Sequence, residues 1–194
     1  NLGEGISGED KKRLDYLFHF CTTIIMKQYN PQSLTKNDSE RPIFIVDMML
    51  GRLARYLRIF GYDVLYFQKI SDEDLVNKAE SESRIVLTRD SRMIRRSPFK
   101  YGRVKFLFIR HDKVLKQLEQ LVKELNLELK INLIRCIECN QILKKVDKER
   151  AKGKVPIFVY KSITNFAYCS NCDKYYWSGS HLELMNRRFS SLLK

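Results

Sequence analysis

Residues 44–64 read FIVDMMLGRLARYLRIFGYDV and contain one strand–helix–strand unit. The apolar run 43–46 predicts a short buried strand that ends at Asp47. Apolar residues then recur at helical spacing until Gly61, a residue typical of a helix end. We expect the helix to turn Leu50, Leu53, Ala54 and Leu57 inward, and Arg52, Arg55 and Arg58 outward. A second strand is predicted over residues 63–67.

The same alternation continues along the chain. Ser71 is placed to cap a helix whose first turn is acidic, and further strands are predicted at 84–88 and 104–109. Asp112 is expected to open another amphipathic helix. Strands and helices in series predict an α/β fold, with a parallel sheet between two helical layers. Right-handed crossovers place the carboxyl ends of all strands at one edge of the sheet.

Acidic residues gather at this predicted edge. Asp47 follows the first strand, Asp90 the third and Asp112 the fourth, while Asp72 and Asp74 begin the helix after the second. Ligands of open α/β sheets bind beyond the strand ends, and clustered carboxylates favour Mg²⁺ or Mn²⁺. One or two such ions support phosphodiester hydrolysis. Aspartate is also a common N-cap, so a structural role stays open, although a carboxylate directly after a buried strand is costly without compensation.

Two Cys-x-x-Cys pairs mark the last third of the chain. Cys136 and Cys139 form the first pair, and Cys169 and Cys172 form the second. Four thiolates at this spacing predict a tetrahedral zinc site, whereas two disulfides are the alternative. Because four ligands close the zinc shell, the predicted role is structural. We expect Trp177 to cover the small core of this zinc ribbon rather than to bind a ligand.

The chain is strongly basic, with a net charge of +13 and a pI near 9.6. A surplus of this size favours a polyanionic partner, of which nucleic acid is the commonest, with a solubility surplus or a basic tail as the plainer explanation. No apolar run is long enough to span a membrane. The residues expected to contact RNA are Arg52, Arg55, Arg89, Arg92, Arg95, Arg96, Lys144, Lys145 and Lys148.

The first 42 residues are predicted to be a helical extension and a linker. Apolar residues at helical spacing over 9–28 include Leu14, Phe18 and Ile25. Packing within the chain is the favoured interpretation of this helix, and docking of a protein partner or of the rest of a parent chain is the alternative. Residues 43–130 are expected to form the α/β domain, and residues 131–194 the ribbon and a closing helix. Because the sequence begins at Asn1, we expect it to be part of a longer polypeptide.

Four segments occur in an order that resembles a known family. FIVDMMLGRLARYLRIFGYDV, RIVLTRDSRM, RCIECN and YCSNCDKYYWSGSH resemble the C-terminal ribonuclease-like family named after the Mut-seven exonuclease. The resemblance implies a PIN-like nuclease fold with a zinc ribbon, and motif acids at Asp47, Asp90 and either Asp72 or Asp74. No motif fixes Asp112. The family occurs in microbial proteins and as the tail of animal 3′–5′ exoribonucleases, and the second setting is the expected one.

Three functions follow as hypotheses. The first is an RNA-binding domain of an exoribonuclease in a small-RNA or gene-silencing pathway, with a surface for a protein partner. The second is a Mg²⁺- or Mn²⁺-dependent ribonuclease in its own right, and the third is a protein-interaction scaffold with no RNA role. The expected location is the cytoplasm, with RNA granules or the nucleus as alternatives.

Overall fold

The computed structural model describes residues 41–177 and 180–192. The predicted N-terminal helix, with Leu14, Phe18 and Ile25, lies outside the described residues. The chain divides into two compact units, and each is described by itself. One includes residues 41–143 and 186–192, and the other includes residues 144–177 and 180–185.

The larger unit is built on a four-stranded parallel sheet, as predicted. Its strand order is β2-β1-β3-β4, with each neighbouring pair in parallel register. The strands are short, and the central strand β1 is fully buried. Their bounds are Phe44–Val46 for β1, Val64–Tyr66 for β2, Ile85–Thr88 for β3 and Phe106–Phe108 for β4.

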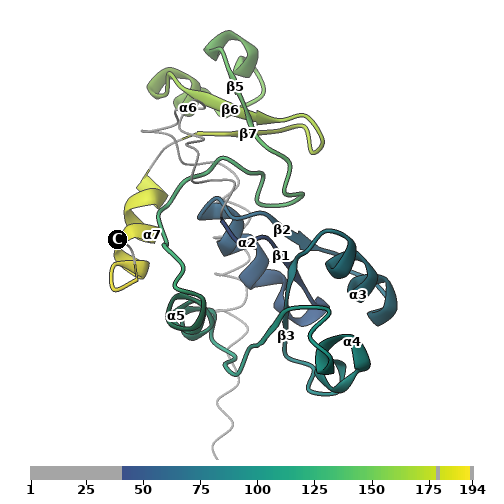
Figure 1. Ribbon diagram of the computed structural model, residues 1–194. Coiled ribbons are helices and arrows are strands. Elements are labelled where there is room, and N and C mark those ends of the chain that lie inside the picture. Colours follow the sequence, from purple (N-terminus) through teal and green to yellow (C-terminus); the bar gives the residue numbers. More distant parts are fainter. Residues whose placement is uncertain (1–40, 178–179, 193–194) are drawn as a thin grey trace, which may run out of the picture. The chain divides into compact units, whose positions relative to one another are not determined.

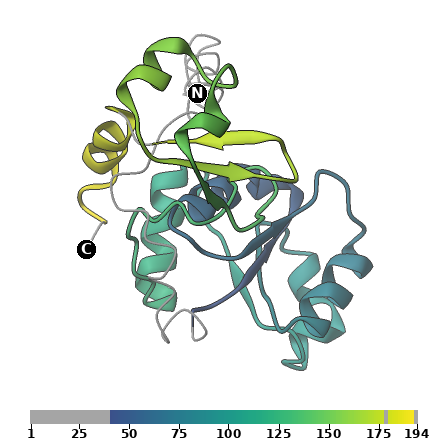
Figure 2. The ribbon, with the colours of Figure 1, turned by 90° about the horizontal axis from the view of Figure 1, so that it is seen from above.

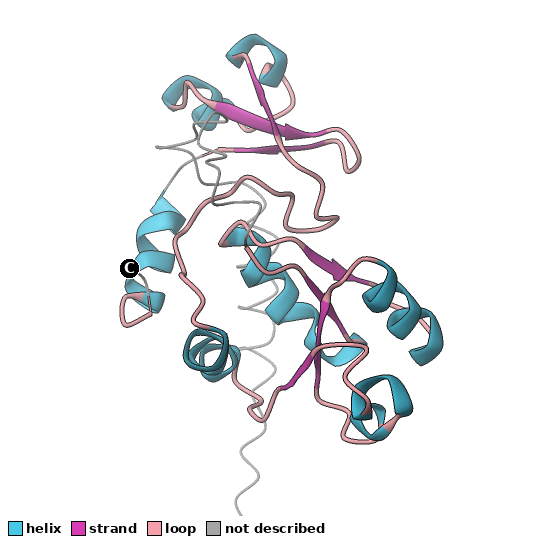
Figure 3. Ribbon diagram, in the orientation of Figure 1, coloured by secondary structure: helices cyan, strands magenta, loops and turns pink. Residues whose placement is uncertain are grey.

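Helices cover both faces of this sheet, which confirms the three-layer α/β architecture (Figures 1 and 3). On one face, Ile45 and Val86 pack with Leu75, Val76 and Ala79 of α3 in a buried cluster. The alternation of side chains along a strand sends Phe44 and Val46 to the opposite face, where α2 and α5 lie. The helical segments are η4 Met48–Leu50, α2 Gly51–Ile59, α3 Asp72–Ser81, η5 Met93–Arg95, α4 Ser97–Lys100 and α5 Val114–Leu125.

Two details of the predicted helices are wrong. Asp112 does not cap α5, because the N-cap position is Lys113, and Asp112 instead forms an ion pair with Arg89. Arg58 does not face outward, because only 3% of it is exposed. The predicted cap of α3 is confirmed, since the Ser71 hydroxyl accepts a hydrogen bond from the backbone N–H of Asp74 at 3.0 Å.

The smaller unit contains a three-stranded antiparallel sheet of order β5-β6-β7. Its strands are β5 Lys144–Val146, β6 Phe166–Cys169 and β7 Lys174–Tyr176, and its helical segments are η6 Lys148–Ala151 and α6 Ile157–Ser162. The helical segments cover one side of the sheet (Figure 2), where Ala151 and Val159 pack with Phe166. Trp177 belongs to the same cluster and is 5% exposed, which confirms its predicted core role.

A closing helix follows, α7 Ser180–Phe189, where one was predicted. Its last residue, Phe189, is fully buried, and its ring lies 5.1 Å from that of Tyr56 and 5.7 Å from that of Phe60. Among the described residues, no helix is long and apolar enough to cross a membrane.

Candidate functional site

The first cysteine pair lies in a tight loop after α5. An antiparallel bridge between Arg135 and Ile142 closes the loop at its base. Within it, the backbone N–H of Cys136 donates to Gln141 at 2.7 Å, and that of Asn140 donates to Cys136 at 2.9 Å. Asn140 has a φ of +70°, the left-handed conformation that asparagine tolerates better than most residues. We call residues Cys136–Asn140 the cysteine loop.

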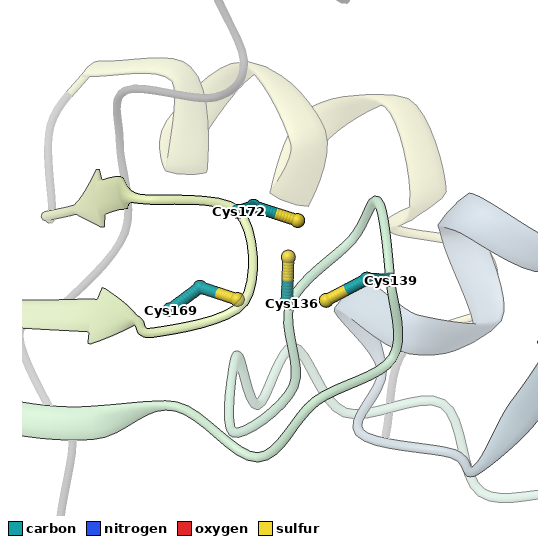
Figure 4. A group of neighbouring side chains, drawn as sticks. All are labelled: Cys136, Cys139, Cys169 and Cys172. Atoms are coloured by element: carbon teal, nitrogen blue, oxygen red, sulfur yellow. The ribbon is translucent and has the colours of Figure 1, made fainter.

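The second pair comes from the turn between β6 and β7, where Cys169 is the last residue of β6. Figure 4 shows the four sulfur atoms pointing toward one another. All four ligand atoms lie within 4.8 Å of one another, and no disulfide joins the four cysteines. Cys136 and Cys169 are buried, while Cys139 and Cys172 are partly exposed.

This arrangement fits a tetrahedral zinc ion. A Zn–S distance of about 2.3 Å places tetrahedral sulfur ligands about 3.8 Å apart, so small side-chain adjustments suffice. Thiolate ligands select zinc over the hard cations Mg²⁺ and Ca²⁺. The geometry therefore supports the predicted four-cysteine metal site.

Side chains elsewhere in the larger unit bind the backbone of the cysteine loop. Arg58 of α2 donates from Nη1 to the carbonyls of Ile137 at 2.9 Å and Glu138 at 2.7 Å. It also donates to the carbonyl of Val64, from Nε at 3.0 Å and from Nη2 at 2.8 Å. Burial lowers the pKa of Arg58, and the negative charges of Cys136, Cys139 and Glu138 oppose that effect.

Asp63, directly before β2, is a second anchor for the loop. Its carboxylate accepts from Asn140 Nδ2 at 2.9 Å and pairs with Arg84 at 2.6 Å and Arg135 at 3.1 Å. Burial raises the pKa of Asp63, but the hydrogen bonds from Arg84 and Asn140 and the charges of Arg135 and Arg84 lower it by more. The net pKa lies below the ordinary value of 3.8, so the carboxylate is held ionised.

Asp47 lies at the carboxyl ends of the strands, opposite the end where Asp63 lies. The strand order reverses there, between β1 and β3. Asp47 is 5% exposed and lies between the ends of β1 and β3. Its Oδ1 accepts from the N–H of Met49 at 2.8 Å, which caps η4. Its Oδ2 accepts from the N–H of Arg89 at 2.8 Å and from the Thr88 hydroxyl at 2.5 Å. These three bonds compensate the buried charge.

The other predicted acids each have partners of their own. Asp90 accepts from the N–H of Arg92 at 2.7 Å, the main cause of its lowered pKa. Asp72 pairs with Arg96 at 3.3 Å, and Asp74 accepts from the Ser71 hydroxyl at 2.6 Å. Among the residues whose side chains the structure describes, the four cysteines are the only acidic, histidine or cysteine group placed to hold a metal ion. A carboxylate metal centre thus stays a prediction.

A family model for the Mut7-C RNAse domain matches residues 42–189. The chain belongs to this family. No curated protein and no solved structure matches it. The expected resemblance is therefore correct at the level of the family, and the chain is a domain of a ribonuclease-related family.

Eight of the nine predicted RNA contacts of this Mut7-C domain fall into two groups. In the first, each arginine has an acidic partner: Arg55 with Glu138, Arg89 with Asp112, Arg92 with Asp90 and Arg96 with Asp72. In the second group, the charged side chains are exposed and have no acidic partner among the described residues; these are Arg52, Arg95, Lys144 and Lys145. Lys148 lies over the ring of Tyr160, 5.0 Å from its centroid.

The residues that sequence reasoning missed are those beneath the cysteine loop, namely Arg58, Asp63, Arg84, Arg135 and Asn140. One signal for Arg58 was present, because it lies four positions after the inward-facing Ala54 and so shares its helix face. The partners of Asp63 carry no local signal, since Asn140 is 77 positions away in the chain.

Proposed function

We propose that this Mut7-C domain binds single-stranded RNA as part of an RNA-processing exoribonuclease of a small-RNA pathway, contributing RNA affinity and a docking surface for a protein partner. The observation that carries the proposal is the set of exposed cations without acidic partners, Arg52, Arg95, Lys144 and Lys145, in a chain of net charge +13. Residues 144–177 alone contain seven lysines and one arginine against three acids. Exposed cations of this kind attract phosphates. A cytoplasmic location, including RNA granules, accords with this role.

The partners of the acids favour binding over catalysis. A catalytic Mg²⁺ or Mn²⁺ needs carboxylate oxygens that face a common point. Here Asp72, Asp90 and Asp112 each pair with a different arginine of the same chain. Both oxygens of Asp47 accept hydrogen bonds from the protein. The arginines therefore supply the positive charge that a metal would otherwise bring.

RNA affinity measured over a salt series tests the proposal. A labelled single-stranded RNA should bind with a steep loss of affinity as salt rises. A triple variant with Arg95→Ala, Lys144→Ala and Lys145→Ala should bind more weakly, with a salt slope reduced by up to about three, one for each phosphate that is no longer neutralised. Lys116→Ala is the matched control, because Lys116 is exposed but pairs with Glu119 at 2.6 Å. Absence of binding at low salt would refute the RNA role and leave the protein scaffold.

The alternative is a metal-dependent ribonuclease, favoured by the position of Asp47 and Asp90 at the carboxyl ends of β1 and β3. Incubation of labelled RNA with Mn²⁺ tests it against an Asp72→Asn/Asp90→Asn double variant. These two acids are accessible, so the substitutions should preserve the fold. Cleavage by the wild type that the double variant loses would establish the enzyme, whereas equal cleavage by both, or by neither, would exclude it.

A further inference from the structure

Arg58, in the last turn of α2, is unusual because its charged side chain is buried. It is 3% exposed, and its described hydrogen bonds all go to backbone carbonyls. A buried guanidinium is costly unless its donors are satisfied. A leucine would fill a helix–sheet interface without that cost, so the position calls for an explanation beyond packing.

The acceptors of Arg58 supply that explanation. Ile137 and Glu138 are the two residues between Cys136 and Cys139, and Arg58 Nη1 contacts both of their carbonyls at 2.9 and 2.7 Å. The separation and direction of the two sulfur atoms depend on the backbone of these two residues. The remaining donors reach the carbonyl of Val64 in β2. One side chain thus connects the sheet to the turn that presents the first two thiols.

Asn140 holds the other end of the same loop. Its Oδ1 accepts from the N–H of Val64 at 3.1 Å, and its Nδ2 donates to Asp63 at 2.9 Å. Both tethers therefore end on the backbone of Val64. The planar fork of arginine suits this task, because it reaches two directions at once, which a lysine ammonium on a flexible stem does not.

We propose that Arg58 is a positioning residue for the four-cysteine site, which raises zinc affinity by holding the Ile137 and Glu138 carbonyls, and so the Cys136 and Cys139 thiols, in their metal-binding arrangement. Outer-shell partners of metal ligands typically change metal affinity by about 10- to 100-fold when they are mutated. The proposal is independent of RNA binding, so failure of either leaves the other standing.

Competition for zinc against a chromogenic chelator tests this role. Arg58→Ala and Arg58→Lys should each weaken zinc binding by about 10- to 100-fold, because lysine restores the charge but not the fork. Arg52→Ala, on the exposed face of the same helix, should bind zinc like the wild type. The absorption spectrum of bound Co²⁺ gives a second readout, since a loosened cysteine loop should broaden its visible bands. Wild-type zinc affinity in a folded Arg58→Lys protein would overturn the proposal.

Two measurements keep the test decisive if the Arg58 variants fail to fold. Asn140→Gly keeps the left-handed backbone at no steric cost while it removes the second tether, and it should also weaken zinc binding. In the wild type, zinc removal should speed hydrogen exchange at the Val64 amide, whose acceptor is Asn140. The Val86 amide, which donates to Lys105 in the sheet, is the reference. Unchanged exchange at Val64 after zinc removal would refute the coupling.

Discussion

Replacement of Asp47 should destabilise the fold in proportion to the hydrogen bonds removed. Asp47→Ala leaves three donors at the ends of β1 and β3 without an acceptor, namely two backbone N–H groups and the Thr88 hydroxyl. The hydroxyl can rotate toward another acceptor, so two donors bear the loss. At about 1–3 kcal/mol for each donor left unsatisfied, the cost is about 2–6 kcal/mol.

Asp47→Asn should cost less, about 1–3 kcal/mol, because the amide retains one oxygen and loses the other. Whichever way the amide turns, its NH₂ group faces a backbone N–H, either that of Met49 or that of Arg89. Urea unfolding followed by circular dichroism measures both changes. The control is Asp112→Asn, since the Asp112 side chain is 84% exposed and the change should stay within about 0.5 kcal/mol. If the two Asp47 variants lose no more stability than that control, the ends of β1 and β3 do not depend on Asp47 as a hydrogen-bond acceptor.

Three further predictions concern the rest of the molecule. The pKa of Asp63 is lowered in the folded state, so its ionised carboxylate stabilises the fold. This stabilisation is fully present above about pH 4 and is lost as the pH falls through the folded-state pKa. Urea midpoints across acid pH should thus fall more steeply for the wild type than for Asp63→Asn, and parallel curves would contradict this. Phe189→Ala should cost about 3–5 kcal/mol, measured by the same unfolding assay, because a fully buried ring is removed; a loss below about 1 kcal/mol would count against the described packing. Metal analysis should give about one zinc ion per chain, and less for Cys139→Ser, while an unchanged content would remove Cys139 from the site.

The parallel sheet could be predicted because its signals are local. Short apolar runs alternating with helical periodicity identify every strand of the larger unit, and Gly61 and Ser71 mark helix boundaries. The wrong prediction for Asp112 also came from a local signal, because an aspartate before a helix often caps it. Here its carboxylate instead pairs with Arg89, which follows β3. Tertiary contacts thus overrode a sound local preference.

The candidate site was predictable only in part. Cysteine spacing alone predicted the four cysteines that the structure brings together. In contrast, a helical arginine between other arginines was read as solvent-facing, and the carbonyls that bind Arg58 lie 79 and 80 positions away. The pairing of Asp72, Asp90 and Asp112 with three different arginines was equally invisible, because composition gives the charges but not which of them meet.

The position of Val64 bears on how this protein avoids unwanted association. β2 is an outer strand of the sheet, and outer strands offer unpaired backbone groups to strands of other molecules. At Val64, however, the N–H is taken by Asn140 and the carbonyl by Arg58, two side chains that together imitate a neighbouring strand. Pairing of another strand with β2 at its first residue is therefore disfavoured. The cysteine loop thus also covers the outer edge of β2, so we expect a variant without the loop to be less soluble.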